Sequence, residues 1–242
     1  MRLSIILPAY NEAENIGLLL GRIDLAIKRF RGTDSKENLE GEIIIVDDSD
    51  DNTAEVARRF SEREKPLLPL RIIRGEGKGL SFAVVKGFAH AHFEHILVMD
   101  ADLQHPPEEI PAILDAVKNK NPDIVILSRF LKSSRRESSL ARKIITAVGL
   151  KLQKVMLPGL RFSDTTTGFF LAKRSVIPPR LEAKGFKILL EILCRGEYRR
   201  EKVVELPFDF EKRRGGKSKL GLKQTWEYWL QLVRLSRDNE TH

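Results

Sequence analysis

The sequence predicts an α/β fold in a single domain, with a mostly parallel, Rossmann-like central sheet flanked by helices. Short, uninterrupted apolar runs alternate with segments of helical spacing along the first half of the chain. Continuous apolar strands between helices indicate a sheet that is covered on both faces. The length of 242 residues fits one large domain or two small ones and is enough to bury a substantial core.

The first half supplies most strands and helices of this sheet. β-Branched and aliphatic residues form the apolar runs, and the first run closes at Pro8. The helix that follows has apolar residues three and four positions apart, and a later helix has Glu108 and Glu109 in its first turn, which suits the helix dipole. The predicted strands are 3–7, 43–46, 70–74, 96–99 and 124–127, and the predicted helices are 11–30, 53–60, 78–92 and 107–118.

The second half is less regular. Its spacing predicts three further helices, two short strands, one turn and two polar, basic loops. The helices are 140–156, 186–193 and 220–235. One strand follows the turn at 164–168 and ends at Leu171, and the other spans 203–210. The loops are 133–139 and 212–219.

The net charge of +8 is unevenly distributed. Residues 1–127 carry a net charge of −6, whereas residues 128–242 carry +14. A basic half implies an anionic partner, which can be nucleic acid, an anionic membrane surface or a phosphorylated substrate. Cys194, the single cysteine, excludes an internal disulfide framework, and no apolar run is long enough to span a bilayer.

Two carboxylates follow the predicted strand 96–99. Asp100 and Asp102 are two residues apart at a strand end, so their side chains project to the same side. Adjacent carboxylates repel each other unless a cation neutralises them, and Mg²⁺ or Mn²⁺ bound together with substrate phosphates fits such hard ligands. Gln104 adds a carbonyl oxygen, while His105 is expected to pack or cap. The alternative is an acidic loop that caps the following helix.

A second acidic segment, 47–53, ends the second strand. Part of it forms a turn and an N-cap for the helix near Thr53. Because four carboxylates exceed the needs of one cap, Asp47 or Asp48 is expected to meet hydroxyl or base donors of a ligand. The glycine-rich segment 75–79 has neither of the phosphate-loop spacings, so a turn before a helix is the simpler interpretation.

Taken in order, the motifs resemble glycosyltransferase family 2, and especially the catalytic domains of its dolichyl-phosphate (polyprenyl-phosphate) mannosyltransferases. The resemblance covers nearly the whole chain. It rests on the stretches 7–12 (LPAYNE), 47–48 (DD), 100–108 (DADLQHPPE), 128–130 (SRF), 167–170 (TGFF), 185–191 (GFKILLE) and 213–219 (RRGGKSK).

The resemblance implies a GT-A fold and an inverting transfer of mannose from GDP-mannose to dolichyl (polyprenyl) phosphate. The positions that match nucleotide contacts are Pro8, Tyr10, Glu12, Val46 and Asp48. The positions that match the metal and diphosphate site, with Mg²⁺ or Mn²⁺ as cofactor, are Asp100, Ala101, Asp102 and Gln104. Arg129, Arg213 and Lys219 match positions that hold the donor phosphates and the acceptor phosphate.

This chemistry needs little general base, because a phosphate monoester is already ionised near neutral pH. The departure of a nucleoside diphosphate is the difficult step, so Asp100, Asp102 and Arg129 are the expected catalytic residues. The loop 133–136 is expected either to be solvated or to close on the acceptor phosphate.

We expect a catalytic domain at 1–219, with a nucleotide-sugar and metal half at 1–127 and an acceptor half at 128–219. Residues 220–242 form an amphipathic helix. Trp and Tyr beside Lys and Arg on this helix are an interfacial composition, whereas packing on its own domain is the alternative. The apolar side carries Leu222, Trp226, Trp229, Leu230 and Val233.

The expected location is cytoplasmic, with peripheral association at the cytoplasmic face of a membrane. The N-terminus has no signal-peptide pattern, and the transmembrane helices that many relatives carry after the catalytic domain are absent from this sequence. A membrane-anchoring partner protein is one way for such a chain to stay near a lipid acceptor.

Two other functions stay open from the residues. One is a polyprenyl-phosphate transferase that uses UDP-glucose or another nucleotide sugar, because no residue fixes guanine against uracil. The distant alternative is a non-enzymatic nucleic-acid-binding protein, although acidic strand ends would repel a duplex. The chain also departs from the common family pattern: 47–53 is one residue shorter, and 164–168 lacks the frequent Pro and Ser.

Overall fold

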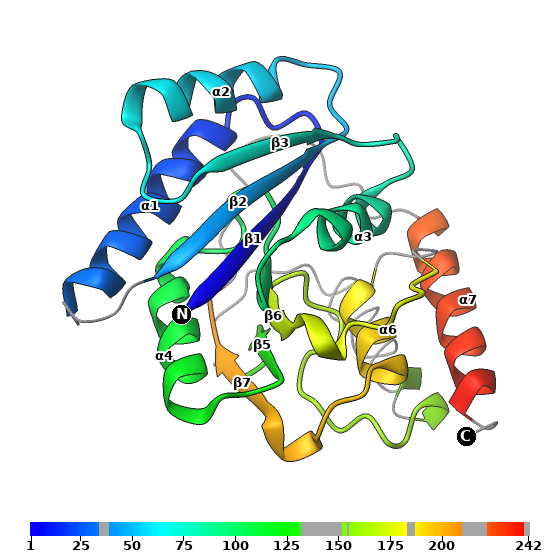
Figure 1. The fold of residues 1–242 in the computed structure, drawn as a ribbon. Helices are drawn as coiled ribbons and strands as arrows, with labels where there is room; N and C mark the ends of the chain where they lie inside the picture. Colours follow the sequence, from blue (N-terminus) through cyan, green and yellow to red (C-terminus); the bar gives the residue numbers. More distant parts are fainter. Residues whose placement is uncertain (34–38, 132–151, 154, 183–186, 210–221, 240–242) are drawn as a thin grey trace.

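The computed structural model describes residues 1–33, 39–131, 152–153, 155–182, 187–209 and 222–239. Within these ranges, seven strands form one sheet in the order β3-β2-β1-β4-β6-β5-β7, with helices on both faces (Figure 1). The predicted α/β architecture is therefore confirmed. The strands are β1 (Arg2–Ala9), β2 (Glu40–Asp47), β3 (Leu70–Arg74), β4 (His95–Val98), β5 (Ile124–Ser128), β6 (Phe170–Lys173) and β7 (Val203–Pro207).

α-Helices and short 3-10 helices lie between and after these strands. The α-helices are α1 (Ile16–Thr33), α2 (Thr53–Glu64), α3 (Leu80–His90), α4 (Ile110–Lys120), α6 (Ile188–Arg195) and α7 (Leu222–Asn239). The short 3-10 helices are η1 (Pro107–Glu109), η2 (Arg174–Val176) and η3 (Arg200–Lys202).

The sheet is parallel except at β6. β3, β2, β1 and β4 run parallel to one another, as do β5 and β7, whereas β6 runs antiparallel to both β4 and β5. The Leu127 N–H donates to the Phe169 carbonyl at 3.1 Å, just before β6 begins. The chain therefore re-enters the sheet directly beside β5, the strand from which it left.

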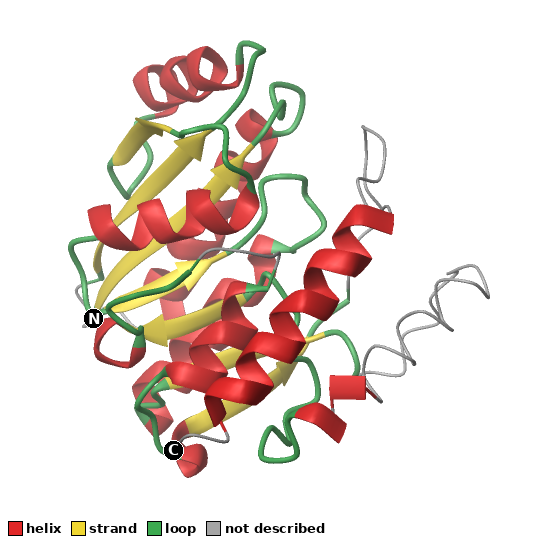
Figure 2. Ribbon diagram, turned by 90° about the vertical axis from the view of Figure 1, so that its right-hand side faces the viewer, coloured by secondary structure: helices red, strands yellow, loops and turns green. Residues whose placement is uncertain are grey.

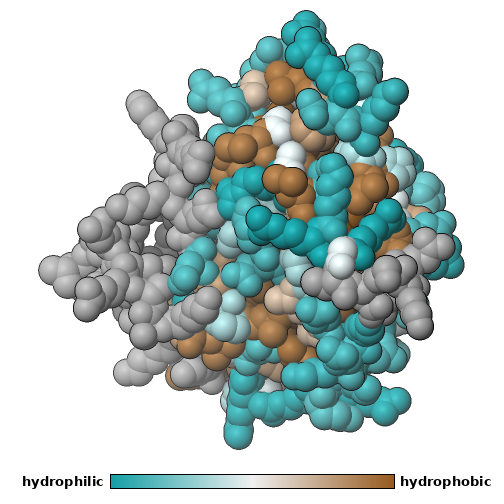
Figure 3. All heavy atoms as spheres, turned by 90° about the vertical axis from the view of Figure 1, so that its left-hand side faces the viewer, coloured by the Kyte–Doolittle hydropathy of each residue, from teal (hydrophilic) through white to brown (hydrophobic). Residues whose placement is uncertain are grey.

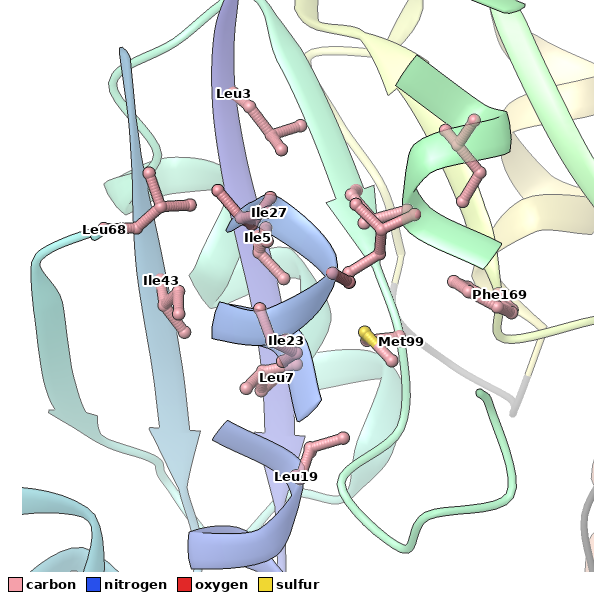
Figure 4. Packing of buried hydrophobic residues seen from close by; sticks show 14 of the residues in the cluster. Leu3, Ile5, Leu7, Leu19, Ile23, Ile27, Ile43, Leu68, Met99 and Phe169 are labelled. Atoms are coloured by element: carbon pink, nitrogen blue, oxygen red, sulfur yellow. The ribbon is translucent and has the colours of Figure 1, made fainter. Parts of the chain in front are cut away.

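Two apolar layers enclose the sheet. Along β1, Leu3, Ile5 and Leu7 pack under α1, α2 and α4, while Ile6 packs against the layer of α3, α6 and α7. Figure 4 shows α1 directing its apolar stripe onto the central strands, and Figure 2 shows helices in front of and behind the sheet. This alternation explains why the strands read as continuous apolar runs.

Several element boundaries differ from the sequence prediction, and those of β1 and α1 lie beside the site. β1 continues through Pro8 to Ala9, because its pairing with β4 ends at Ile6 and the missing N–H of Pro8 interrupts no ladder there. α1 begins at Ile16 rather than at residue 11. Glu12 uses its backbone N–H to bind the Thr53 hydroxyl at 2.9 Å, so the residues before α1 belong to a loop.

α7 packs on the domain and also has an outer side. Leu232 and Leu235 are buried in the same apolar cluster as α6. Trp229 and Leu230, from the predicted apolar side, are 42% and 47% exposed. The packing interpretation therefore holds for the inner face of α7, and the interfacial interpretation stays a prediction for its outer side.

Other surface and sequence features complete the fold. Figure 3 shows the face on the α1 side, where hydrophilic atoms surround separate hydrophobic patches. Exposed leucines on α1 include Leu18 and Leu25. The structure describes four positions of the predicted helix 140–156, and all four are helical: 152, 153, 155 and 156. Among all described residues, no helix combines the length and hydropathy needed to cross a bilayer.

Candidate functional site

The carboxyl ends of β1, β2 and β3 bring the predicted nucleotide-contacting positions to one edge of the sheet. Pro8 lies opposite Val46 in the β1–β2 register, and both side chains are buried. Tyr10 follows β1 and is 45% exposed, while Asp48 follows β2 and is half-buried. A ligand at this edge would meet a polar rim above an apolar floor.

Hydrogen bonds lock the loops after β1 and β2 to each other. Asn11 adopts a left-handed backbone, with φ of 57°, and its N–H donates to the Ser49 hydroxyl at 2.8 Å. Its side-chain oxygen accepts from the Asp50 N–H at 2.9 Å. Glu12 is buried and accepts from the Asn15 side-chain amide at 2.7 Å. The rim is therefore held before any ligand arrives.

The four carboxylates of 47–53 have different tasks. Asp47 is buried and accepts from the Ser49 N–H at 3.0 Å, so it closes a turn. Asp51 accepts from the Thr53 N–H at 3.0 Å at the start of α2. Burial raises the pKa of Asp51, but the hydrogen bonds from Thr53 outweigh burial and lower it. Of the two alternatives for a ligand contact, Asp48 is the one at the open edge.

The glycine-rich segment 75–79 forms a wall beside Asp48. The Gly77 N–H donates to Asp48 Oδ1 at 2.8 Å, and Gly77 has a φ of 67°. A Cβ atom on Gly75 would lie 1.8 Å from Asp48 Oδ1, so only glycine allows this approach. The segment is a turn before α3, as predicted, and it also fixes the Asp48 carboxylate.

The turn after β4 holds its carboxylates through its own backbone. The Asp100 N–H donates to His105 Nδ1 at 2.9 Å, and the Gln104 N–H donates to Asp102 Oδ1 at 3.1 Å. Leu103 between them is buried with a φ of 64°, a strained conformation of the kind found at functional sites. Neither η1 nor α4 has a side-chain cap, so the capping interpretation of these aspartates fails.

His105 packs under this turn, as predicted. It is 2% exposed, stacks on Phe169 at 5.1 Å and meets Phe208 edge-on at 5.8 Å between ring centroids. Burial lowers the pKa of His105 to about 3, so the imidazole is neutral near pH 7. Its approach to Asp100, 3.7 Å from Nδ1 to Oδ2, is therefore not an ion pair.

The turn has a donor set that fits a hard divalent cation. Asp100, Asp102 and Gln104 supply carboxylate and amide oxygens. Within the described residues there is no group of three or more His, Cys, Asp or Glu side chains that could hold a metal ion by itself. Carboxylate and amide oxygens suit Mg²⁺ or Mn²⁺, which commonly keep water and substrate phosphate among their ligands.

Arg129 is held by a residue that the sequence prediction did not single out. Asp164, which is fully buried, accepts from Arg129 Nε at 2.6 Å and from Nη2 at 2.9 Å. The Thr166 hydroxyl also accepts from Nη2 at 3.0 Å. The sequence prediction assigned only a turn to 164–168, and no local pattern links Asp164 to Arg129, which lies 35 positions away. Fork-to-fork pairing fixes the plane of the guanidinium.

The charges of this pair reinforce each other. Burial by itself raises the pKa of Asp164, but the hydrogen bonds and charge of Arg129 outweigh burial and lower it. Burial by itself lowers the pKa of Arg129, whereas Asp164 and then Asp100 raise it. Both groups are therefore ionised near neutral pH, and Asp100 lies within electrostatic reach of Arg129.

A narrow cleft of about 20 Å³ lies beside Asp100. Gly168 borders it, and a Cβ atom there would lie 3.1 Å from Asp100 Oδ2. The N-terminal ends of α3 and α6 also line the cleft, with Leu80, Ser81, Ile188 and Leu189. A larger hollow of about 500 Å³ lies at the amino end of the sheet, near Met1 and Arg2, and has none of the candidate residues in its lining.

Lys187 adds a cation that the sequence prediction did not assign. It is the N-cap of α6, next to the cleft residue Ile188. Burial first, and then the Arg129 charge, lower the pKa of Lys187 to about 8, while Asp100 and Asp164 oppose this shift. The predicted positions Arg213 and Lys219, and the loop 133–136, lie outside the described residues.

Comparisons with known proteins agree with this architecture. Residues 4–178 match the Glycosyl transferase family 2 model. The chain is 41% identical over 242 residues to a dolichol-phosphate mannosyltransferase of Pyrococcus furiosus, covering 98% of this chain and 64% of that protein. It is 36% identical to a dolichol-phosphate mannosyltransferase of Mycosarcoma maydis, covering 97% and 79% of the two chains.

Solved structures share the fold at low sequence identity. Glucosyl-3-phosphoglycerate synthase from Mycobacterium tuberculosis, in complex with Mn²⁺, UDP-glucose and phosphoglyceric acid, superposes with a TM-score of 0.68 at 15% identity, covering 98% of this chain and 79% of that one. Mannosyl-3-phosphoglycerate synthase from Rubrobacter xylanophilus superposes with a TM-score of 0.66 at 17% identity, covering 100% and 76%. With its family match and its sheet, the chain belongs to glycosyl transferase family 2 and has the GT-A fold.

Proposed function

We propose that this chain transfers mannose from GDP-mannose to dolichyl or another polyprenyl phosphate, with inversion at the anomeric carbon. The observation that carries the proposal is the position of Asp100, which lines the cleft and lies within electrostatic reach of the Arg129 guanidinium that Asp164 holds. Relatives named dolichol-phosphate mannosyltransferase support the acceptor class and the sugar.

Different residues bind the two anionic substrates, the nucleotide sugar and the acceptor phosphate. The rim of Tyr10 and Asp48 receives the nucleoside, and the turn at Asp102 and Gln104 receives the diphosphate. A divalent cation bound there would neutralise charge on the leaving diphosphate. Arg129 draws the acceptor phosphate toward the donor despite the repulsion between the two anions.

The transfer itself needs no proton from the protein. An oxygen of the acceptor phosphate forms the new bond to the anomeric carbon, while the bond from that carbon to the diphosphate breaks. The acceptor oxygen is already anionic near neutral pH. Neutral His105, buried beneath the turn, is consistent with a structural role rather than with general-base catalysis.

A donor panel tests the proposal. GDP-mannose, UDP-glucose and UDP-N-acetylglucosamine are each offered with a short polyprenyl phosphate and Mg²⁺ or Mn²⁺, and lipid-linked sugar is measured. We expect mannose transfer to exceed the other reactions. A preference for UDP-glucose would replace the proposed donor, and the absence of lipid-linked sugar with every donor would overturn the transferase proposal.

Replacing Asp102 tests the cation site. We expect Asp102→Ala to lower turnover about 100-fold or more, because charge on the departing diphosphate loses its stabilisation. Asp115→Ala, at an exposed position on α4, serves as the control and keeps wild-type turnover. Circular dichroism and the thermal midpoint should show that both variants fold. Near-wild-type turnover of Asp102→Ala with added metal would contradict the assignment.

We also propose that the chain docks on the cytoplasmic face of a membrane through α7. The exposed side chains of Trp229 and Leu230 support this contact, as does the basic second half of the sequence. A polyprenyl acceptor requires the catalytic edge to approach the lipid surface. A membrane-anchoring partner protein remains part of the proposal as a second means of attachment.

A further inference from the structure

The inner face of α7 bears a polar contact that the proposed chemistry does not use. The Tyr228 hydroxyl lies 3.4 Å from Gln153 Oε1 and donates to it. The Thr165 hydroxyl donates to the same oxygen at 2.6 Å. Gln153 is 3% exposed and Thr165 is fully buried. One buried amide oxygen therefore accepts from two parts of the chain that are far apart in sequence.

The contact lies one residue from the group that orients Arg129. Thr165 follows Asp164, which accepts from the Arg129 N–H at 3.2 Å as well as from two positions of the guanidinium. Because consecutive residues share a backbone, fixing the Thr165 side chain restricts the direction of the Asp164 carboxylate. Both residues are fully buried, so water does not replace a lost partner at low cost.

The charge environment of Tyr228 supports the same proximity. Burial, with a smaller contribution from the Asp164 carboxylate, raises the pKa of Tyr228 to about 12. The phenol therefore stays protonated and keeps its role as a donor near neutral pH. A second polar bond fastens α7 nearby, where the Gln231 side-chain amide donates to the Lys187 carbonyl at 3.1 Å. α7 is thus hydrogen-bonded both to Gln153 and to Lys187, the N-cap residue of α6.

We infer that Gln153 is a positioning residue that ties α7 to the 164–168 turn and thereby sets the direction in which Arg129 presents its guanidinium. This inference rests on the proposed function, in which Arg129 binds phosphate. Gln153 itself touches neither substrate nor the reacting atoms in this assignment; it acts through Thr165 and Asp164. Buried polar networks of this kind give a site one defined geometry.

A double-mutant cycle tests the inference. Gln153→Met keeps the side-chain length and removes the amide, and it is made with Arg129 and with Arg129→Lys. With Arg129 present, we expect Gln153→Met to lower kcat/KM about tenfold, and in the Arg129→Lys background by less than about twofold, because coupled residues are not additive. Tyr228→Phe, which keeps the ring and removes a long hydrogen bond, should show the same pattern with a smaller loss of about threefold.

A matched change on the same helix provides the control. Arg234→Gln breaks the ion pair with Glu182, 2.5 Å from Nη1 to Oε2, and this pair does not reach the 164–168 turn. We expect kcat/KM to stay within about twofold of wild type in both backgrounds. A role limited to folding would instead lower kcat/KM by the same factor whether residue 129 is Arg or Lys, and that result would overturn the inference.

A crystal structure of Gln153→Met gives a readout that does not depend on turnover. The expected result is a guanidinium turned away from its paired contact with Asp164. An unmoved Arg129–Asp164 pair overturns the inference whatever the activity. A wild-type chain that transfers no sugar in the donor panel would overturn the proposed function, whereas an active chain that is insensitive to Gln153→Met and Tyr228→Phe would overturn only the positioning role.

Discussion

At the scale of single residues, the site depends on groups that other residues hold in place. Asp48 is fixed by the backbone of Gly77, and Arg129 is fixed by the Asp164 carboxylate. Asp100 is held through its own N–H by His105. Each support can be removed without touching the functional group itself, and this separates orientation from chemistry.

Gly75→Ala removes the space that Asp48 occupies. The new Cβ atom would lie 1.8 Å from Asp48 Oδ1, so the carboxylate must move. We expect the KM for the nucleotide sugar to rise about tenfold, the loss of roughly one good hydrogen bond. Steady-state kinetics with varied donor checks this result.

Gly32→Ala is the matched control for that change. Gly32 is exposed in the last turn of α1, and its Cβ atom would meet no atom within 4 Å. We expect an unchanged KM and a free energy of unfolding higher by about 0.5–1 kcal/mol, because alanine favours a helix. A folded Gly75→Ala protein with the wild-type KM would show that Asp48 does not contact the donor.

The Asp164–Arg129 pair makes stability depend on pH. The pKa of Asp164 is lower in the folded protein than the value of about 3.9 in an unfolded chain. The stabilisation is therefore complete above about pH 5 and is lost as the pH falls through the folded pKa. We expect Asp164→Asn to lower the free energy of unfolding by about 3 kcal/mol at pH 7, because Arg129 loses its buried partner.

Urea unfolding at pH 7, 5 and 3 checks that prediction. The difference in free energy of unfolding between wild type and Asp164→Asn should be large at pH 7 and 5. It should shrink toward pH 3, where the Asp164 carboxylate of the wild-type protein begins to gain a proton. A difference that is constant over this range would mean that the pair contributes through packing and not through charge.

At the scale of elements, α7 serves the domain with one face and the surroundings with the other. Leu232 and Leu235 share an apolar cluster with Leu189 and Leu190 of α6. Trp229 and Leu230 are exposed. One face of α7 is therefore part of the hydrophobic core, and the other exposes apolar side chains. We expect α7 to unfold together with the rest of the domain.

Two leucines of α7 distinguish these faces. Leu232 is fully buried, and Leu232→Ala should lower the free energy of unfolding by about 2–5 kcal/mol in one cooperative transition. Leu230 is 47% exposed, and Leu230→Ala should change the free energy of unfolding by less than about 0.5 kcal/mol. Urea unfolding followed by tryptophan fluorescence and far-ultraviolet circular dichroism measures both variants. A separate early transition for α7 would contradict its place in the core.

The sequence predicted the elements that carry strong patterns. Continuous apolar runs that end in Asp47 and Asp100 identified β2 and β4 and the edge where acidic groups gather, because that signal is local. The antiparallel direction of β6 was not predicted, since strand direction depends on long-range pairing and not on the composition of four residues.

In the candidate site, too, local patterns were predictable and long-range contacts were not. Asp100 and Asp102 were identifiable because both carboxylates lie two residues apart in one turn. The hold of Asp164 on Arg129 was not identifiable, since the two residues are 35 positions apart and meet only when β6 returns to the edge. Lys187 lies in the stretch 185–191 that carried the resemblance, but its role was not predicted, because its place beside the cleft at the start of α6 depends on the fold.

At the scale of the whole molecule, the proposed membrane docking would depend on charge and on apolar surface. The first half, with its net charge of −6, contributes the acidic turn, and the second half, with +14, contributes α7. In this proposal, basic residues would attract an anionic surface through charge, whereas Trp229 and Leu230 would insert through their apolar area. The two contributions respond differently to salt.

Vesicle flotation separates these contributions. We expect the wild-type chain to bind anionic vesicles strongly at low salt and to keep weaker binding at high salt. The double variant Trp229→Ser with Leu230→Ser should lose about tenfold in affinity at both salt concentrations, because the apolar contribution is not screened. Leu18→Ser with Leu25→Ser on α1, at positions 45% and 56% exposed, is the control and should bind like wild type. No binding by the wild-type chain at either salt concentration would refute membrane docking.

The antiparallel β6 has a consequence for how such a transferase changes its acceptor over evolution. Because the Leu127 N–H donates to the Phe169 carbonyl, the two ends of the segment between these residues are fastened side by side. Each doubling of the length of such a loop adds only about 0.6 kcal/mol of closure entropy. Insertions between Leu127 and Phe169 would therefore cost little closure entropy. If this segment binds the acceptor, as proposed for Arg129, a change in its length or sequence would alter the acceptor while β1, β2 and their nucleotide edge stay as they are.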